Sequence, residues 1–312
     1  MQQRYLGSSG LQVSELGMGT MSWGHETDEE AAAESLRSYI DDGGNLVDTA
    51  AGYSDGSSEA MLGGMLGDLV ARQDLVIVSK AGISRRNGKR TVDTSRRAML
   101  DALDGTLARL GTDHLDLWLA HTWDEHVPLD ETLGALELAV STGRTRYAGV
   151  SNYSGWQLAR AASISAVPLV ANQVEYSLIQ RSAEREILPA AKALGIGILA
   201  WSPLGRGVLT GKYRGNIPAD SRGASDRLAA YVEPYLSGRP ERITEALITA
   251  ARGLDRQPLE LALGWLLQQP ALSAAIVGAR TPAQLKEAVS GNFSAVPAQI
   301  AEVLDEVSAL PD

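Results

Sequence analysis

Short apolar segments alternate with helical patterns along most of the chain, and this alternation limits the possible folds more than any other feature. Eight segments have the apolar character of buried strands: residues 16–20, 45–49, 75–80, 115–120, 145–150, 169–173, 196–201 and 272–277. Helical periodicity separates most of them. Strands that are buried on both faces and joined through helices form parallel sheets. Eight such units therefore predict a closed (β/α)8 barrel, a TIM barrel of the α/β class.

An open, doubly wound sheet is the alternative to a closed barrel. Dinucleotide-binding sheets of that kind carry a Gly-x-Gly-x-x-Gly sequence after the first strand. Here the first strand contains only Gly17-Met18-Gly19, which is weak support for such a sheet. No linker or short repeat interrupts the alternation, so we expect residues 1–312 to form a single barrel domain.

Both ends of the chain are expected to add elements to the barrel. Residues 5–7 and 11–13 flank Ser8-Ser9-Gly10, a pattern typical of a β-hairpin, which would form an N-terminal lid. An extra C-terminal helix over residues 297–310 would pack across the barrel wall or its mouth. Residues 202–240, which contain many glycines, prolines and arginines, are predicted to form a long loop after a strand end.

Composition narrows the classes of function. The net charge of −10 disfavours a large nucleic-acid interface, which normally requires a concentrated basic surface. The chain has no cysteine, which excludes disulfides, thiolate metal ligands and cysteine nucleophiles. No residue pattern indicates a metal site, a signal peptide or a membrane span. We expect a cytoplasmic protein with no nucleic-acid or membrane partner, and the oligomeric state stays open.

Polar residues recur at the predicted strand ends. In βα barrels the carboxyl ends of the strands converge on one face, where the active sites lie. The residues at these ends are Asp48, Lys80, His121, Ser151 with Asn152, Gln173, and Trp201 with Ser202. Asp48 leaves a buried strand five residues before Tyr53, which indicates a site that handles a proton. His114 and Asp116, at the opposite ends, are expected to serve stability.

Several of these residues occur in motifs of one known family. Asp48 with Tyr53, Lys80 in the sequence VSK, and His121 after LWLA match the catalytic tetrad of the aldo-keto reductase superfamily. Residues 149–153 (GVSNY), 172–176 (NQVEY) and 201–205 (WSPLG) are similar to further motifs, in the same order. The chain therefore resembles this superfamily over nearly its whole length, and most closely the subgroup of bacterial reductases and potassium-channel β subunits.

The resemblance implies reversible hydride transfer between a nicotinamide cofactor and a carbonyl compound. Tyr53 would be the general acid, and the Lys80 ammonium is expected to lower the pKa of its phenol. Asp48 would pair with Lys80, compensating a charge that is costly to bury alone. His121 would orient the carbonyl group and assist proton transfer. Each residue alone has an ordinary structural explanation, but four together at strand ends favour catalysis.

The resemblance also implies a cofactor site. Ser151, Asn152 and Gln173 would hold the nicotinamide carboxamide, and Trp201, where many relatives carry tyrosine, would stack on the ring. Further cofactor contacts are expected from Thr20, Asp48, Ser202, Pro203, Leu204, Gly205, Arg206, Gly278, Arg280, Gln284 and Glu287. Ala288 stands where relatives often have an asparagine. Arg280 is the candidate for binding a 2′-phosphate, so NADPH is expected, with NADH as the alternative.

The substrate pocket is less well defined by the sequence. Its expected residues are Met21, Trp23, Tyr53, His121 and Trp123, with Tyr153 nearby. Loops at this face vary freely, so the prediction extends only to an aldehyde or a ketone, including aromatic ones and sugars. We interpret His25 and His126 as ordinary loop histidines because no motif includes them.

Two other functions stay open at this point. The resemblance to channel β subunits permits a regulatory or sensor protein that binds NADP(H) on the same fold with little turnover. A barrel aldolase would use Lys80 as a Schiff-base amine. Asp48 and the cofactor motifs disfavour the aldolase.

Overall fold

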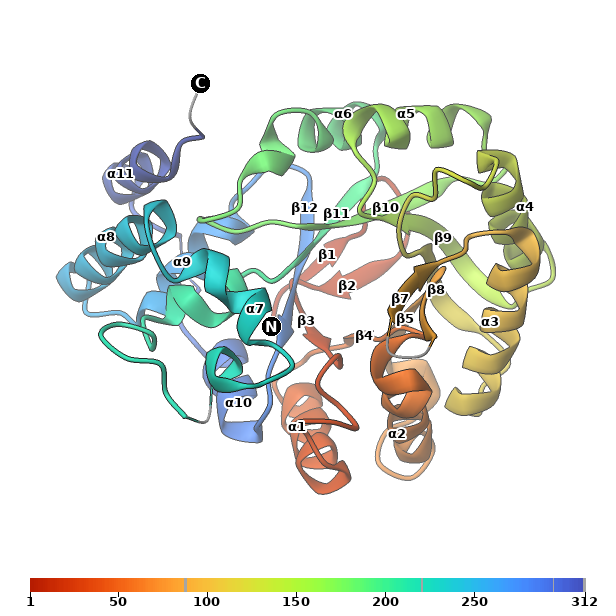
Figure 1. Ribbon diagram of the computed structural model, residues 1–312, viewed down its shortest axis with the longest axis horizontal. Coiled ribbons are helices and arrows are strands. Elements are labelled where there is room, and N and C mark those ends of the chain that lie inside the picture. The colour runs from red at the N-terminus through yellow and green to blue at the C-terminus, as the bar shows by residue number, and fades with distance from the viewer. Residues whose placement is uncertain (87–88, 220, 294, 311–312) are drawn as a thin grey trace.

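Eight parallel strands close into a barrel in the computed structural model, which describes residues 1–86, 89–219, 221–293 and 295–310. The strands are β3 (Leu16–Gly19), β4 (Leu46–Asp48), β5 (Val76–Ala81), β8 (Leu115–Ala120), β9 (Thr145–Ser151), β10 (Leu169–Glu175), β11 (Gly197–Trp201) and β12 (Leu272–Gly278). They follow one another around the barrel in chain order, and β12 pairs with β3 to close it (Figure 1). The predicted (β/α)8 barrel is confirmed.

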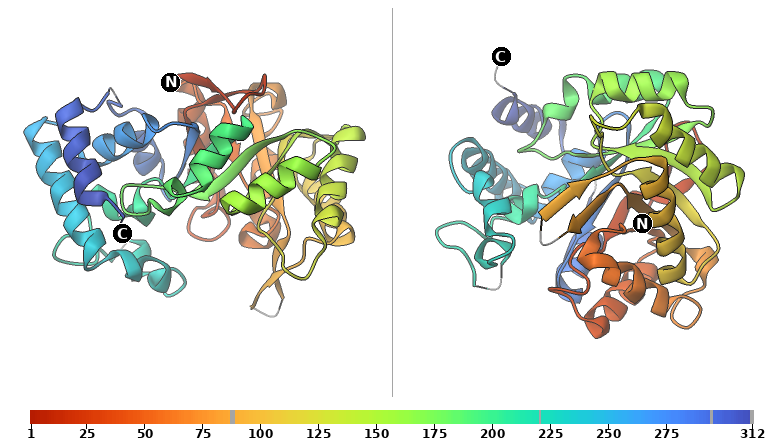
Figure 2. Two further views of the ribbon diagram at one scale, coloured as in Figure 1. Left: turned by 90° about the horizontal axis from the view of Figure 1, so that it is seen from above. Right: turned by 45° about the vertical axis from the view of Figure 1, so that its right-hand side comes forward.

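Helices surround the barrel (Figures 1 and 2). They are α1 (Glu29–Asp41), α2 (Ser57–Met65), α3 (Arg96–Leu110), α4 (Leu129–Ser141), α5 (Gly155–Ile164), α6 (Ile187–Leu194), α7 (Ala229–Val232), α8 (Arg239–Gly253), α9 (Pro258–Leu267), α10 (Pro282–Val289) and the predicted extra C-terminal helix, α11 (Ala298–Ser308). Helix α11 packs on α8 beside the barrel. Within the described parts of the chain, no helix has both the length and the apolar character needed to cross a bilayer.

The alternation of side chains along each strand divides the core into two parts. On β5, Val76 and Val78 belong to an apolar cluster inside the barrel, whereas Ile77 belongs to the layer between strands and helices. On β8, Leu117 and Leu119 point inward with them. Because successive side chains point to opposite faces of a strand, a strand buried on both faces is apolar throughout.

The N-terminal hairpin covers the end of the barrel at which the strands begin. It consists of β1 (Gln3–Tyr5) and β2 (Gln12–Ser14), which pair antiparallel as predicted. Leu6 and Val13 join the apolar cluster inside the barrel. The amide of Ser8 donates to the carbonyl oxygen of Gly195, just before β11 begins. The carboxyl ends of the strands therefore remain available for a site.

A second hairpin, which the sequence interpretation missed, follows β5. It consists of β6 (Ile83–Arg86) and β7 (Lys89–Val92). The left view of Figure 2 shows the two hairpins at opposite ends of the barrel. The signal for it was Asn87-Gly88, a dipeptide typical of two-residue hairpin turns, although these two residues lie outside the described part of the chain.

Other elements differ from the predictions in their bounds. The helix predicted over residues 58–69 ends at Met65, and Gly67, with φ +91°, follows two residues later. The helix predicted from residue 184 begins at Ile187, after a 3-10 turn over Ser182–Glu184. Within its described residues, the predicted loop 202–240 contains α7, the start of α8 and 3-10 segments over Gly205–Thr210, Arg222–Ala224 and Glu233–Tyr235.

Candidate active site

The turn after β4 brings Tyr53 back over the end of its own strand. Asp48 is the last residue of β4, and Tyr53 begins a 3-10 turn over Tyr53–Gly56. The amide of Ala51 donates to the carbonyl oxygen of Lys80 at 3.0 Å, which fixes the turn to β5. Gly52 permits a close approach to the next loop, because a Cβ atom there would lie 2.6 Å from the carbonyl oxygen of Ile83.

Lys80 lies at the centre of a hydrogen-bonded cluster. Its Nζ donates to Asp48 Oδ1 at 2.7 Å, to the carbonyl oxygen of Thr49 at 2.9 Å and to Tyr53 Oη at 3.1 Å. All three ammonium protons thus have an acceptor. Gln173 Nε2 donates to the second carboxylate oxygen, Asp48 Oδ2, at 2.6 Å. Strands β4, β5 and β10 together fix the position of the ammonium group beside the phenol.

The pKa values in this cluster favour a protonated phenol beside a protonated amine. Burial raises the pKa of Tyr53 above its ordinary value, although Lys80 lowers it in part. Lys80 thus acts on the phenol in the expected direction, but the pKa of Tyr53 stays above its ordinary value because the desolvation of the phenolate is the larger effect. Burial lowers the pKa of Lys80, but Asp48 and Tyr53 outweigh burial and raise it overall.

His121 reaches the same point from the end of β8. Its amide donates to the carbonyl oxygen of Ala81 at 2.8 Å, and its ring lies edge-on to Tyr53 with 6.1 Å between ring centroids. Desolvation, followed by the charges of Lys80 and Arg90, lowers the pKa of His121 well below its ordinary value. Its Nδ1 is buried and has no hydrogen-bond partner in the described chain. The imidazole is therefore neutral at neutral pH and has hydrogen-bonding capacity left for a ligand.

A cavity of about 790 Å³ opens at this end of the barrel. Its volume lies within the range of roughly 300–1,000 Å³ that is common for small-molecule and cofactor sites. Most of the residues selected from the sequence line it: Met21, Asp48, Tyr53, His121, Ser151, Asn152, Gln173, Trp201, Ser202, Pro203, Leu204, Arg206, Gly278, Arg280, Gln284 and Glu287. The carboxyl ends of the strands thus bring distant motifs together on one wall.

Strained backbone is concentrated on this wall. Seven described residues other than glycine have positive φ, and five of them line the cavity: Ser54, Asp55, Asn152, Ser202 and Arg206. A side chain in the left-handed region costs free energy, and such residues gather at functional sites. The distribution supports a functional role for the cavity that does not depend on any motif.

An amide and an indole stand together at the ends of β9 and β11. Trp201 Nε1 donates to Asn152 Oδ1 at 3.0 Å, and Asn152 Nδ2 donates to Ser151 Oγ at 3.1 Å. Ser151 Oγ in turn donates to the carbonyl oxygen of Gln173 at 2.9 Å. Gln173 Oε1 makes no hydrogen bond with other described residues, so it can accept one from a ligand amide.

Six of the predicted residues do not line the cavity: Thr20, Trp23, Lys80, Trp123, Tyr153 and Gly205. Lys80 is buried and donates to Tyr53, which does line it. Thr20 is buried, and its Oγ1 donates to the carbonyl oxygen of Asp48 at 3.1 Å. Trp23 is buried in the apolar core and does not line the cavity. Trp123 packs edge-on against Tyr153 and beside Trp156, outside the cavity. Gly205 is buried behind the wall. The expected substrate contacts of Trp23 and Trp123, and the expected cofactor contacts of Thr20 and Gly205, therefore receive no support from this cavity.

Basic residues from the loop after β11 complete one side of the cavity. Lys212, Arg222, Arg227 and Tyr231 line it but were not selected from the sequence. Arg222 Nη2 donates to the carbonyl oxygen of Gly278 at 3.2 Å. The composition of residues 202–240 contained the only signal, since arginine is frequent there.

Arg206 is more constrained than the sequence suggested. It forms a two-pronged ion pair with Glu175, with both hydrogen bonds at 3.0 Å, and its guanidinium stacks on Tyr231 with 3.7 Å to the ring centroid. Tyr235 also donates to Glu175. The charge of Arg206 is therefore largely compensated inside the protein, which limits the attraction of Arg206 for a phosphate.

His25 also lines the cavity, whereas His126 does not. The interpretation of His25 as an ordinary loop histidine therefore missed its position at the opening. In the parts of the chain that the structure describes, no three His, Asp or Glu side chains are placed to hold a metal ion.

Three features together indicate an oxidoreductase of the barrel class. They are the barrel itself, the buried ammonium–carboxylate pair beside a phenol, and the large cavity with amide and indole side chains. The sequence model of the aldo/keto reductase family matches residues 15–308. The chain belongs to this family, whose members typically bind a nicotinamide cofactor and act on small carbonyl compounds.

Curated proteins of three kinds are similar to the chain over most of its length. An uncharacterized oxidoreductase, YrpG, of Bacillus subtilis is 33% identical, with 98% of this chain and 96% of the relative covered. A probable voltage-gated potassium channel subunit beta of Oryza sativa is also 33% identical, with 99% and 96% covered. L-glyceraldehyde 3-phosphate reductase of Escherichia coli K12 is 33% identical, with 93% and 87% covered. The family thus includes both reductases and channel subunits.

Proposed function

We propose that the protein is an NADPH-dependent reductase that converts aldehydes or ketones to alcohols, with Tyr53 as the general acid. The observation that carries this proposal is the position of Lys80 Nζ, which donates to both Asp48 and Tyr53 at the wall of the cavity. When bound, a reduced nicotinamide would supply the hydride for the new C–H bond at the carbonyl carbon. Tyr53 then completes the reduction by giving its phenolic proton to the carbonyl oxygen.

The residues around Tyr53 prepare it for this step. Lys80 stabilises the phenolate that remains after proton donation, because its ammonium group lies 3.1 Å from the phenol oxygen. Asp48 accepts from Lys80 and holds it in place, and Gln173 fixes Asp48 by donating to its other carboxylate oxygen. His121, neutral and beside the phenol, orients the carbonyl oxygen toward Tyr53 by hydrogen bonding. A proton from solvent restores the phenol after release of the alcohol.

The cavity wall fits a nicotinamide dinucleotide. Gln173 Oε1 has acceptor capacity for a carboxamide, and Trp201 presents an aromatic face at the end of β11. Lys212, Arg222 and Arg280 line the part of the cavity that would take the phosphates. Arg280 lies just before α10, so the helix N-terminus and the guanidinium together favour an anion there. This arrangement favours NADPH, with NADH as the weaker alternative.

The test is a screen of the purified protein with NADPH and with NADH against aldehydes and ketones. The expected result is loss of the reduced-nicotinamide absorbance with reactive aldehydes, faster with NADPH. Formation of one alcohol for each nicotinamide oxidised would establish the stoichiometry. Tight nucleotide binding without turnover of any carbonyl compound would contradict the proposal.

That negative outcome would favour the second candidate, a regulatory protein that senses NADP(H). The observation behind it is the similarity to proteins whose names describe potassium-channel β subunits, which cover almost the whole chain. The two candidates share the nucleotide site and differ in turnover, so the same screen separates them.

A further inference from the structure

The hairpin β6–β7 places like charges opposite one another at the opening of the cavity. Arg85 pairs directly with Arg90 across the two strands. Like charges in opposite positions of an antiparallel pair destabilise it. Arg85 and Arg90 both line the cavity, and Arg90 makes no ion pair with another described residue. An anion bound beside Arg90 would compensate its charge.

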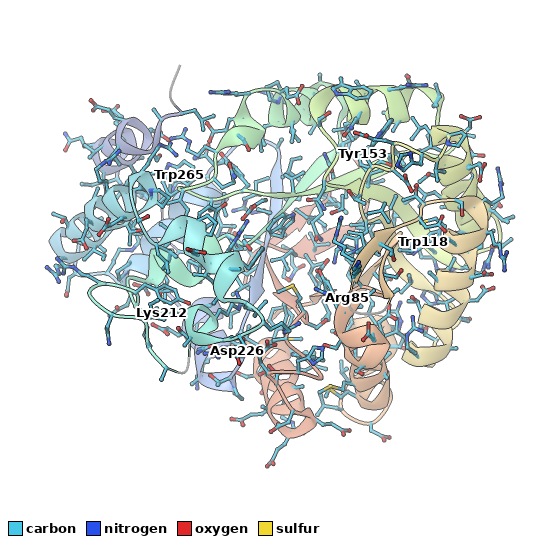
Figure 3. All side chains as sticks on the ribbon, viewed as in Figure 1. Arg85, Trp118, Tyr153, Lys212, Asp226 and Trp265 are labelled. Atoms are coloured by element: carbon cyan, nitrogen blue, oxygen red, sulfur yellow. The ribbon has the colours of Figure 1, made fainter. Side chains whose placement is uncertain are left out.

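The hairpin lies across the barrel from the basic loop that would hold the cofactor phosphates. In the closed strand order, β5, which leads into the hairpin, stands opposite β11, which leads into residues 202–240. Figure 3 shows Arg85 and Lys212 well separated, with Arg85 beside β5 and Lys212 on the side of α7. A single dinucleotide that extends along β11 and β12 leaves the hairpin for another ligand.

The charges on the cavity wall also divide into two groups. On the side of β11 and β12, Glu175 pairs with Arg206 and Glu26 pairs with Arg227, and Arg222 and Arg280 also line the cavity. On the hairpin side stand Arg85 and Arg90, and the lining carboxylate of the neighbouring turn is Asp55. Arg90 thus offers a cation at the opening of the cavity although the whole chain has a net charge of −10.

The hairpin cations are also close to the groups that would carry out the reduction. Gly52, next to Tyr53, lies against the backbone of Ile83 in β6. The charge of Arg90 acts on His121. A small molecule whose carbonyl group contacts Tyr53 and His121 could therefore place a second group, a few bonds away, against the hairpin.

We propose that Arg90, together with Arg85, binds an anionic group of the substrate, so that the preferred substrates are carbonyl compounds with a carboxylate or phosphate. This inference rests on the proposed reductase function and specifies its substrate class. Guanidinium groups suit both anions because they form charge-assisted, two-pronged hydrogen bonds.

The experiment compares benzaldehydes that differ in the charge of the para substituent. For the wild type, kcat/KM for 4-carboxybenzaldehyde should exceed that for methyl 4-formylbenzoate by about tenfold, a ratio typical of one charge-assisted hydrogen bond. Arg90→Gln should remove this preference, mainly by raising KM for the carboxylate, and should leave kcat/KM for the ester unchanged. Arg90→Lys should restore part of it. 4-Formylphenyl phosphate, compared with 4-methoxybenzaldehyde, shows whether phosphate is preferred to carboxylate.

Arg97→Gln is the matched control, because it removes one arginine charge from the outer surface of α3, where the Arg97 side chain is 93% exposed. Arg97→Gln should leave unchanged both the acid-to-ester ratio and the phosphate-to-methoxy ratio of kcat/KM. Equal kcat/KM values for the acid and the ester in the wild type, or a preference that survives Arg85→Gln/Arg90→Gln, would overturn the proposal.

Binding measured by calorimetry with nucleotide present separates this inference from the proposed function. If no aldehyde is turned over, the reductase proposal fails, but binding of 4-carboxybenzaldehyde still tests the anion site. Binding about tenfold weaker in Arg90→Gln than in Arg97→Gln would support the site. Equal binding in the two variants would overturn it.

Discussion

Lys80 Nζ lies 2.7 Å from Asp48 Oδ1, and their side chains are 0% and 3% exposed. A charge pair at this depth carries a high desolvation cost, so it is weak support for stability in itself. Here the ammonium also donates to Tyr53 at the cavity wall. We therefore infer that the pair serves to hold the Lys80 ammonium group beside the Tyr53 phenol. Removal of the pair should lower both the free energy of unfolding and the rate of turnover.

Replacing Asp48 by asparagine should leave Lys80 buried without its counter-ion. Breaking a buried pair by removing one partner costs about 3–5 kcal/mol, and we expect a loss of that size in the free energy of unfolding. Turnover should fall as well, because Lys80 would lose its proton more easily. Denaturant unfolding measures the free energy of unfolding, and steady-state kinetics measure turnover. Asp101→Asn, which removes the exposed partner of Arg97, should change neither.

Tyr53→Phe should separate binding from chemistry. The variant lacks the phenolic proton but keeps the ring, so reduction should slow by about 10²–10⁴-fold, the usual contribution of a general acid. Nucleotide binding, followed by fluorescence titration, should stay as in the wild type, because the cofactor contacts come from other strands. Turnover close to the wild-type rate would show that another group donates the proton.

The pKa of His121 implies a particular pH dependence of stability. In the unfolded chain this histidine takes up a proton near an ordinary pKa of about 6.5, whereas in the folded protein its pKa lies well below that value. The unfolded state thus binds more protons as pH falls through 6.5, and the free energy of unfolding should decrease there. His121→Gln should show a shallower decrease between about pH 7 and pH 5. His126→Gln, at an exposed position, should keep the wild-type slope.

The residues that the sequence located best are those attached directly to strand ends. Asp48, Lys80 and Gln173 belong to strands, and parallel strands in a barrel must bring their carboxyl ends together, so their proximity followed from strand order alone. Asp116, at the opposite end of β8, accepts from Arg72 and from the amide of Ile77, the stabilising role expected there. The place of a residue within a strand can therefore be predicted without knowledge of loop conformation.

The misplaced residues all belong to loops. Trp23 and Trp123 follow strand ends, but the direction of a loop side chain depends on turns and packing that a motif does not encode. For Arg206, the sequence could not show that Glu175 neutralises it. The hairpin that contains Arg85 and Arg90 was missed because its strands are polar, although Asn87-Gly88 is a strong turn signal.

An ion pair between two loops should control release of the nucleotide. Glu26, in the loop after β3, accepts from Arg227 in the loop after β11, at 2.6 and 3.1 Å, and Arg227 lines the cavity. Because Arg227 is 39% exposed, the pair should contribute at most about 1 kcal/mol. We therefore expect Arg227→Ala to speed nucleotide dissociation by about two- to fivefold in stopped-flow fluorescence.

Charge exchange tests whether the pair itself is responsible. Glu26→Arg with Arg227→Glu should restore slow dissociation, whereas each single exchange should accelerate it, because like charges would then face each other. Arg214→Ala is the matched control, since Arg214 pairs with Glu245 and does not line the cavity. Added salt should narrow the difference in nucleotide dissociation rate between wild type and Arg227→Ala, because salt screens a partly exposed ion pair. Dissociation as fast in Arg214→Ala as in Arg227→Ala would mean that general loosening of the loop, and not this ion pair, governs release.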